Sequence, residues 1–451
     1  MLKRRCRLST THIILLSFLI AIAIGTLLLS LPISTQTGES VPIIDALFTA
    51  TTSTCVTGLV TLPTSTTWSV FGQVVILILI QIGGLGVITT LFGVAIFMHK
   101  KMKLSDGLLI QDSLNINSMA EAFPFIKRII KWTFCIEFIG AVLYCPIFIR
   151  DFGLYGIWAS VFTSISAFCN AGIDVLGLNS LCDYSTNTMI NCVTSFLIIM
   201  GGLGYVVWED VLQLALSWRK GVAIKKRLSL HSKIVLLTTL VLIVGGGILI
   251  LLFDYNNPNT IGAMPLLDKI KVSLFQSITC RTAGFATIPQ ENFTTSSSII
   301  SMLLMFIGGS PVGTAGGVKT VTVVVVFLAT FAIVCNKSDV EVFNRRITQE
   351  SINKAISVVV VSFSIMLLST ILLSSCTDAP FLHIIYETIS ASATVGVTMG
   401  LTPTLNLMGK IIIICTMYLG RVGPISLAIA FSANKEHKNI VKNPIEEINV
   451  G

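Results

Sequence analysis

The chain has 451 residues, of which 12% are charged and 53% are hydrophobic, and its formal net charge is +8. Soluble domains carry about 25% charged residues, so this composition excludes an ordinary soluble protein and indicates one embedded in a membrane. The positive charge lies in short stretches between apolar segments, which argues against a nucleic-acid-binding surface.

Eight apolar segments follow one another along the chain, and a membrane helix needs about 20 such residues. They are 12–34, 70–98, 129–149, 190–217, 233–253, 297–334, 353–375 and 406–432. The first follows the basic sequence KRRCR, as in a signal peptide, but it is too long for one and has a poor cleavage site after it. We therefore expect eight transmembrane spans, the sixth of them interrupted by glycines.

Lysine and arginine residues are concentrated in alternate connections between these spans. The basic stretches are 3–7, 100–131, 219–233, 337–354 and 435–442. Cytoplasmic loops of membrane proteins carry such an excess, so both termini are expected in the cytoplasm. The other connections are richer in acidic residues and are expected outside the cell. Docking of a cytosolic partner is a second use for the basic stretches.

A short glycine motif recurs four times, as CVTGL (55–59), CNAGI (169–173), RTAGF (281–285) and TVGV (394–397). Successive glycines lie 114, 112 and 112 residues apart. Each motif ends a half-length apolar segment with an aromatic residue nine or ten positions before the glycine. This period identifies an internal repeat. The four repeats are predicted to cover 1–100, 101–225, 226–340 and 341–451.

The half-length segments, of 10–14 residues, are too short to cross the hydrocarbon core as helices. They must enter and leave by one face, as a re-entrant helix followed by extended chain. Such unpaired backbone is tolerated only where it faces protein or a water-filled pathway. The sequence therefore predicts an all-α membrane protein with four repeats of helix, re-entrant pore helix and helix around one central pore.

Glycine at the end of each re-entrant helix permits positive φ and close approach of four backbones, with their carbonyls turned toward an ion. The negative end of each helix would also favour a cation. Glycines that only pack helices would instead lie within spans. We predict a selectivity filter made by Val56, Thr57, Gly58, Asn170, Ala171, Gly172, Thr282, Ala283, Gly284, Thr394, Val395 and Gly396.

The stretch FIGGSPVGTAGGVKT (306–320) interrupts the sixth span. It lacks the Gly-Lys-Ser/Thr ending of a phosphate-binding loop, and no strand precedes it. A kinked helix is the simple alternative, but five glycines and Pro311 indicate exposed backbone at membrane depth. Arg421 lies in the last span, where a buried charge needs a partner or a role in the pathway. We expect its guanidinium to hold carbonyls of the 308–317 loop and its charge to repel cations, with snorkelling to the interface as the alternative.

These four motifs, together with GGSPVGTAGG, resemble the Trk/Ktr/HKT superfamily of potassium transporters, and within it the membrane subunit of a bacterial Ktr system of the KtrB or KtrD type. The resemblance covers about residues 12–451. It implies that the glycine-rich stretch is an intramembrane gate below the filter. The gate residues would be Gly308, Gly309, Ser310, Gly313, Thr314, Gly316, Gly317 and Arg421.

The resemblance further implies a homodimer in the bacterial plasma membrane, with the ending EEINVG (446–451) at the dimer contact. A cytosolic ring of RCK-domain subunits would regulate it by binding ATP or ADP, and cyclic di-AMP. Sodium dependence is expected without a residue assigned to it, and no cofactor is expected.

Potassium uptake through a gated, channel-like pore is the predicted function, driven by the membrane potential. The alternatives are an alternating-access cation symporter, which usually shows two inverted repeats rather than four parallel ones, and a membrane enzyme. No span carries a paired acid, a histidine pair or an activated serine, and no Cys/His cluster has metal-ligand spacing, so an enzyme is not expected. Glu137, in the third span, is interpreted as a packing residue.

Overall fold

The computed structural model describes residues 10–87, 89–90, 92–93, 119–219 and 228–423. The basic clusters at 3–7, 100–103 and 220–227, the final part of the last predicted span and the ending EEINVG lie outside these residues. Within them the regular secondary structure is helical except for one two-stranded hairpin, β1 (Glu341–Val342) and β2 (Arg345–Arg346).

Four long helices alternate with shorter ones along the chain. The long helices are α1 (Thr10–Leu29), α7 (Met119–Phe152), α11 (Leu230–Asp254) and α15 (Gln349–Ser374). Each is long and apolar enough to cross a membrane. Large apolar side chains on their outer faces are exposed, including Leu27, Phe138 and Leu252. These faces are suited to contact with lipid.

A short helix follows each long one, as the half-length segments predicted. These helices are α2 (Ile43–Thr54), α8 (Tyr155–Cys169), α12 (Leu266–Thr279) and α16 (Phe381–Ser392), with 12 to 15 residues each. Pro42, Pro265 and Pro380 directly precede three of them. Proline suits a helix start, because its fixed φ and missing N–H cost nothing there. All four are largely buried, with many serine and threonine side chains among their buried residues.

A second helix completes each group. These helices are α4 (Val70–Leu85), α9 (Thr188–Leu203), α13 (Thr295–Phe306) and α17 (Leu407–Val422). The residue before each helix caps it, because its side chain accepts a hydrogen bond from a backbone N–H in the first turn. These capping residues are Ser69, Asn187, Thr294 and Asn406 respectively. Such a cap is worth about 1 kcal/mol.

The predicted spans 70–98, 190–217 and 406–432 are wrong as continuous helices. The helices α4, α9 and α17 end at Gly86, Gly204 and Gly423, which have φ of 84°, 87° and 91°. A glycine with positive φ is a common helix end. After Gly204 the chain turns by 100° into α10 (Tyr205–Arg219). By length and composition four helices can span a membrane, or five if the bent pair is one span, among the residues described.

The predicted glycine interruption of 297–334 is present, because α13 ends at Phe306 and α14 (Thr320–Val334) begins beyond the glycine-rich stretch. The remaining elements are short: α3 (Thr64–Thr67), η1 (Pro32–Ser34), η2 (Cys182–Tyr184), η3 (Gln290–Asn292) and η4 (Thr402–Thr404).

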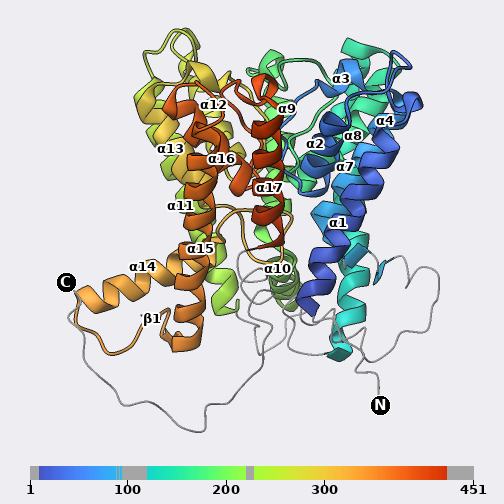
Figure 1. Cartoon of the computed structure of the whole chain (residues 1–451). Coiled ribbons are helices and arrows are strands. Elements are labelled where there is room, and N and C mark those ends of the chain that lie inside the picture. The colour runs from blue at the N-terminus through green and yellow to red at the C-terminus, as the bar shows by residue number, and fades with distance from the viewer. Residues whose placement is uncertain (1–9, 88, 91, 94–118, 220–227, 424–451) are drawn as a thin grey trace, which may run out of the picture.

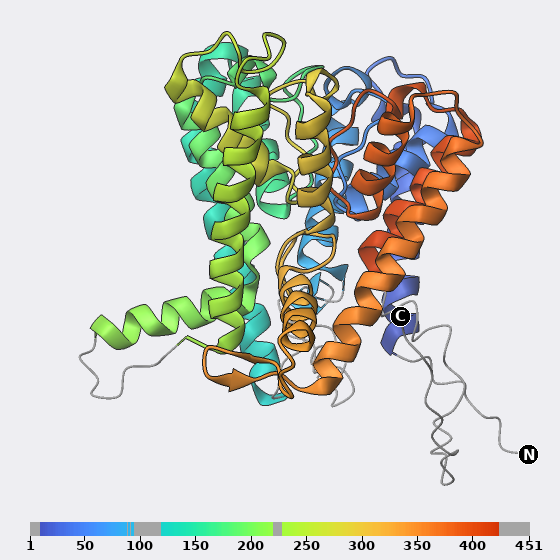
Figure 2. The same ribbon diagram turned by 90° about the vertical axis from the view of Figure 1, so that its left-hand side faces the viewer.

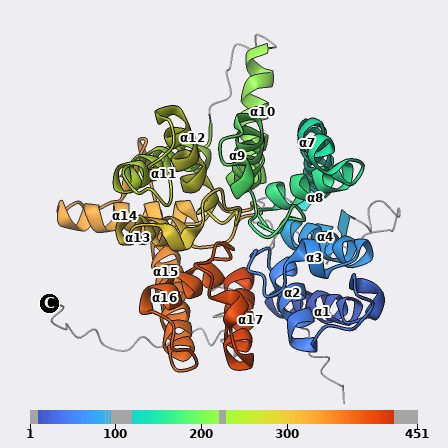
Figure 3. The ribbon, with the colours of Figure 1, turned by 90° about the horizontal axis from the view of Figure 1, so that it is seen from above.

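The four groups close into a ring, seen from above in Figure 3. Within each group the short helix packs against the long one, and α2, α8 and α16 also pack against the second helix of their group. Between groups, α4 packs on α8, α9 on α12, α13 on α16, and α17 on α2. The last contact joins the end of the chain to its beginning. The ends of the short helices point toward the centre of this ring, where Figures 1 and 3 show the connecting loops meeting.

Candidate functional site

Each short helix ends in a turn with two left-handed residues. The residue two positions before the glycine has φ of 55° at Val56, 58° at Asn170, 70° at Thr282 and 51° at Thr394. The glycines follow with φ of 101° at Gly58, 64° at Gly172, 86° at Gly284 and 99° at Gly396. The positive φ predicted for the glycines is confirmed. The left-handed residues before them were not predicted, because three of the four are β-branched and avoid this region.

The four glycines, here called the glycine ring, meet at the centre of the structure. A Cβ added to Gly58 would lie 2.6 Å from the carbonyl oxygen of Ala171 and 3.1 Å from Cα of Gly396. At Gly284 it would lie 2.7 Å from the carbonyl oxygen of Val395. Such distances exclude any side chain without movement of the backbone. The ring is therefore built on close backbone contact that glycine alone allows.

The other two members of the ring close the circle. A Cβ on Gly172 would lie 2.5 Å from Cα of Gly284 and 2.7 Å from the carbonyl oxygen of Ala283. One on Gly396 would collide with the carbonyl oxygen of Thr57. Residues predicted from four distant parts of the sequence are thus brought together, with backbone carbonyls of each turn beside the glycine of another.

Side chains of the short helices hold these turns from behind. The N–H of Gly58 donates to Oγ1 of Thr52 (3.0 Å), and the N–H of Gly396 donates to Oγ of Ser390 (3.1 Å). In the second turn, Ile173 N–H donates to Oγ of Ser166 (3.1 Å). The buried hydroxyls of the short helices therefore satisfy backbone donors beside the glycine ring.

Glu387 was missed by the sequence reasoning. It is fully buried in α16, and its carboxylate accepts hydrogen bonds from Oγ1 of Thr398 (2.7 Å) and Oγ1 of Thr402. Both threonines lie in the chain that leaves the glycine ring after Gly396. Glu387 thereby ties the fourth turn to its own helix.

A repeat alignment contains the signal for this residue. The position directly after the aligned aromatic is occupied by Thr49, Thr163, Gln276 and Glu387 in the four repeats. Gln276 donates to Oε1 of Gln290 (2.6 Å), which also accepts from the hydroxyl of Tyr386 (3.0 Å). The long polar side chains of repeats three and four reach the departing chain.

The 308–317 loop packs against the underside of two turns of the ring. The N–H of Gly316 donates to Oγ1 of Thr282 (3.2 Å), and Oγ1 of Thr314 donates to the carbonyl of Phe168 at the end of α8 (3.1 Å). The N–H groups of Ser310 and Thr314 donate to carbonyls of Gly202 (2.9 Å) and Gly201 (3.1 Å). The plain helix kink is wrong, because the chain between α13 and α14 is not helical and its polar groups are satisfied within the loop and by neighbouring repeats.

Arg421 joins this loop to two other parts of the ring of helices. Its Nη1 donates to the carbonyl of Thr314 (2.6 Å) and its Nη2 to the carbonyl of Gly83 in α4 (2.5 Å). The expected contact with loop carbonyls is thus present in the structure. Snorkelling to an interface does not fit a guanidinium held between two backbone carbonyls.

Two further cations contact the same loop and were not predicted. The ammonium of Lys319 donates to the carbonyl of Ala315 (2.6 Å). The guanidinium of Arg281, only 7% exposed, donates weakly to the carbonyl of Gly308 (3.4 Å). Three positive side chains from three elements therefore face carbonyls of one loop.

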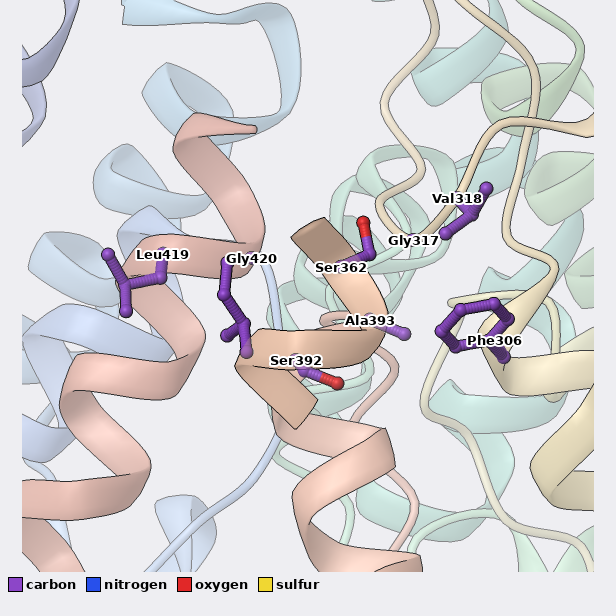
Figure 4. A pocket seen from close by; sticks show the side chains of 9 residues that line it. Phe306, Gly317, Val318, Ser362, Ser392, Ala393, Leu419 and Gly420 are labelled. Atoms are coloured by element: carbon purple, nitrogen blue, oxygen red, sulfur yellow. The ribbon is translucent and has the colours of Figure 1, made fainter. Parts of the chain in front are cut away.

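The space beside the loop is small. A cavity of about 20 Å³ separates the end of α16 from the loop and α17, and Figure 4 shows its lining. It is lined by Phe306, Gly317, Val318, Ser362, Ile365, Ser392, Ala393, Leu419 and Gly420. A second cavity, of about 10 Å³, touches Gly202, Arg281 and Gly309. Each volume is close to that of a single water molecule.

One glycine near the end of three second helices explains how close these elements come. A Cβ on Gly83, Gly201 or Gly420 would collide with the carbonyl of Thr54, Phe168 or Ser392 respectively. Each of those carbonyls lies in the last turn of the short helix of the same group. These three glycines therefore let the second helix of their group lie directly against the short helix that supports the glycine ring.

Glu137 makes helix-to-helix contacts that agree with the packing interpretation. Its carboxylate accepts from Nε2 of Gln81 in α4 (3.1 Å), and its backbone carbonyl accepts from Oγ of Ser164 in α8 (2.6 Å). Both contacts link α7 to its neighbours, and Sγ of Cys169, the residue directly before Asn170, also donates weakly to Oε1 of Glu137 (3.9 Å).

Comparisons with known proteins agree with this arrangement. The model of the TrkH family, described as a cation transport protein, matches residues 5–443. The potassium/sodium uptake protein NtpJ of Enterococcus hirae is 39% identical over 99% of this chain and 98% of its own length. The Ktr system potassium uptake protein B of Bacillus subtilis is 38% identical, with 96% of this chain and 95% of that protein covered. These relatives are named as transporters, not enzymes.

A solved structure gives the same fold. The potassium transporter TrkH from Vibrio parahaemolyticus superposes with a TM-score of 0.73 over 95% of this chain and 86% of that one, at 15% sequence identity. The helical architecture and a multi-pass membrane location follow from the family and from the apolar helices. The chain belongs to the TrkH family of cation transport proteins, among its Ktr-type potassium uptake members.

Proposed function

We propose that this protein takes up potassium through a selective pore at the glycine ring, driven by the membrane potential, which supplies about 2.3 kcal/mol per charge per 100 mV. The observation that carries this proposal is the meeting of four equivalent turns at one centre, with backbone carbonyls beside each glycine. Carbonyls so placed can replace the hydration shell of a potassium ion. The names of NtpJ and of the Ktr relatives support potassium as the transported ion.

The proposed topology has eight spans in four repeats, with both termini in the cytoplasm of a bacterial cell and the short helices entering from outside. The four long helices supply four of these spans. The second helices, with 12 to 16 residues, are too short to cross alone, so each would complete a span with the chain that follows it in the predicted apolar segment. The positive-inside pattern gives the orientation. The repeats keep the predicted bounds 1–100, 101–225, 226–340 and 341–451. No cofactor takes part; the bound species are the transported potassium ions and an activating or coupled sodium ion.

The 308–317 loop is the proposed gate. It touches the second and third turns of the glycine ring through Phe168 and Thr282, so it lies directly in the way of an ion that leaves the ring. Arg421 holds it at Thr314 and adds positive charge below the ring. Opening would require the loop to leave these contacts.

Regulation is assigned to partners outside this chain. A homodimer that carries a cytosolic RCK-domain ring would sense ATP or ADP, and cyclic di-AMP. The β1–β2 hairpin offers a docking surface, because Arg345 and Arg346 are exposed at its second strand. The gate needs such a ligand-dependent partner, since a ligand shifts an equilibrium only if it prefers one state.

Rubidium flux into liposomes that contain the purified chain tests the proposal. Replacing Gly58 by serine puts a side chain 2.6 Å from the Ala171 carbonyl oxygen, and we expect sodium to compete much better against rubidium. Gly245→Ser is the matched control, because nothing lies within 4 Å of a Cβ at that position of α11. Equal sodium competition in both variants would show that the glycine ring is not the selective site, and alternating access would become the better model.

A further inference from the structure

A cavity of about 300 Å³, with both apolar and basic residues in its lining, lies at the foot of the structure between the start of α11 and the β1–β2 hairpin. It is lined by Leu228, Leu230, Lys233, Phe343, Asn344 and Arg345. None of these residues belongs to the glycine ring or to the 308–317 loop, so the cavity is separate from the proposed ion pathway. Figure 2 shows the hairpin beside the lower end of α11.

Two cations face this cavity without a carboxylate partner among the described residues. Lys233 lies 5.6 Å from the ring centre of Phe343, and no ion pair within the described ranges includes it or Arg345. By contrast, the neighbouring Arg346 is paired with Asp339 at 2.8 Å. The cavity therefore presents positive charge that an anion could neutralise.

One carboxylate near the start of α11, that of Asp210, already has hydrogen-bond donors of its own. Asp210 accepts hydrogen bonds from Oγ of Ser229 and Oγ of Ser232, both at 2.5 Å. Ser229 itself caps the helix by accepting the N–H of Ser232. The helix start thus has its own partners, and Lys233 remains available to the cavity.

The hairpin turn is built with an aromatic residue at an unfavourable position. Phe343 and Asn344 form its two central residues, with φ of 51° and 59°. Asparagine or glycine is favoured at both positions of such a turn, whereas a bulky residue with positive φ is an outlier. The strain keeps a half-exposed ring over Lys233 at the cavity wall, which points to a functional constraint.

The level of the cavity indicates what the anion is. Helix α14 ends only seven residues before β1 and exposes Phe327, Phe331 and Val334, which need an apolar environment. Both α14 and α10 run sideways out of the bundle near the height of the hairpin (Figures 1, 2 and 3). Helix α10 combines exposed apolar side chains, such as Val211 and Leu216, with the acidic residues Glu209 and Asp210, as a helix at the boundary between lipid and water does.

From these observations we propose that the cavity binds the phosphate headgroup of an anionic phospholipid of the cytoplasmic leaflet. Lys233 and Arg345 contact the phosphate, and Phe343 covers the adjacent glycerol at the interface. Basic pockets between helices on this side of a membrane take such headgroups. The inference rests on the proposed function only for the orientation of the chain in the membrane.

Lipid retention by the full-length protein tests this site, by native mass spectrometry after titration with phosphatidylglycerol or zwitterionic phosphatidylcholine. The wild type should retain phosphatidylglycerol selectively. Lys233→Gln and Arg345→Gln should each weaken that binding about fivefold, the effect of one basic residue near a charged surface. Arg346→Gln removes a charge from the same hairpin but not from the cavity, and should leave binding unchanged.

Phe343→Asn keeps a residue that tolerates the left-handed turn, so the hairpin is retained while the aromatic wall is lost. Weaker retention of phosphatidylglycerol is expected here as well. Equal binding by the wild type and both cavity variants would overturn the proposal. Equal loss in Arg346→Gln would also overturn it, because it would show that the overall charge of the hairpin, and not the cavity, attracts the anionic lipid. Competition by inorganic phosphate at the same concentration would make the ligand a soluble phosphate. Rubidium flux is measured separately, so failure of the transport proposal is distinguishable from failure of this one.

Discussion

Arg421→Ala is expected to raise the flux of rubidium without changing ion preference. The substitution removes two hydrogen bonds from a guanidinium to carbonyls, one to Thr314 in the 308–317 loop and one to Gly83. A hydrogen bond to a charged group contributes about 1.5–3 kcal/mol. Only the bond to Thr314 distinguishes a closed loop from an open one. Its loss should therefore shift the opening equilibrium by about 10-fold to about 150-fold in favour of the open state.

Rubidium uptake into liposomes at matched protein content measures this shift, and sodium competition in the same assay measures selectivity. Arg421→Lys separates the two roles of the residue, because lysine keeps the charge but cannot reproduce the fork of an arginine. It should raise flux less than alanine does. Lys410→Ala is the control, since it removes a cation from the same helix that pairs with Asp45 at 2.5 Å, away from the loop.

Lower flux in Arg421→Ala together with altered sodium competition would refute the assignment of a latch. That outcome would place Arg421 in the support of the glycine ring, through its contact with Gly83 beside the first short helix. A gain in Lys410→Ala of similar size would instead show that positive charge anywhere on α17 opposes the ion.

Three further outcomes are expected. Glu387→Ala should weaken rubidium preference over sodium, while Glu387→Gln, which keeps an acceptor for Thr398, should retain most of it. Burial raises the pKa of Asp174, in the loop after the second turn, to about 6, so the folded state holds this proton more tightly than the unfolded state does. The free energy of unfolding should therefore fall by about 2–3 kcal/mol as pH rises from 4 to 6. Thermal unfolding of Asp174→Asn should not show this pH dependence. The purified chain should show no response to ATP until its cytosolic partner is added, and charge reversal at Arg345 and Arg346 should reduce the gain in flux; an ATP effect on the chain alone would contradict this.

The four short helices and the glycine ring could be predicted because their signals are local and repeated. A truncated apolar segment that ends in glycine has few structural solutions in a membrane, and four such segments at one period require a shared centre. The interruption of the sixth predicted span could be predicted equally well, because no continuous helix accommodates the five glycines and the proline between Phe306 and Thr320. In each case the constraint lies within about 15 residues of sequence.

The ends of the second helices could not be predicted in this way. Gly83 and Gly86 stand in the same short motif, yet one lies inside α4 and the other ends it with φ of 84°. A hydropathy pattern does not distinguish them, because both glycines lie within one continuous apolar segment. Their difference comes from packing, since Gly83 is required by the carbonyl of Thr54 against it, whereas Gly86 is required by the turn of its own backbone.

The contacts that hold the 308–317 loop could not be predicted from the sequence either, because they join residues of different repeats. Arg421 is conspicuous in an apolar helix, so a partner could be expected, but Arg281 and Lys319 sit in stretches that other features explain. Only the fold shows that all three face carbonyls of the same loop. A charged residue beside a glycine motif is therefore ambiguous until the neighbouring repeat is placed.

The three cations come from the third and fourth repeats because the proposed gate is a single loop, whereas the glycine ring is built from four repeats. The ring itself needs four equivalent turns, and each repeat supplies one with the same pair of left-handed residues. A single loop from the third repeat cannot be held symmetrically, so its anchors must be one-sided. Its N–H groups are taken by carbonyls of the second repeat at Gly201 and Gly202, and its carbonyls by cations of the third and fourth. The second repeat keeps both glycines of its pair and contacts the loop through their carbonyls, whereas the fourth contacts it through the side chain of Arg421, which stands in place of the second glycine.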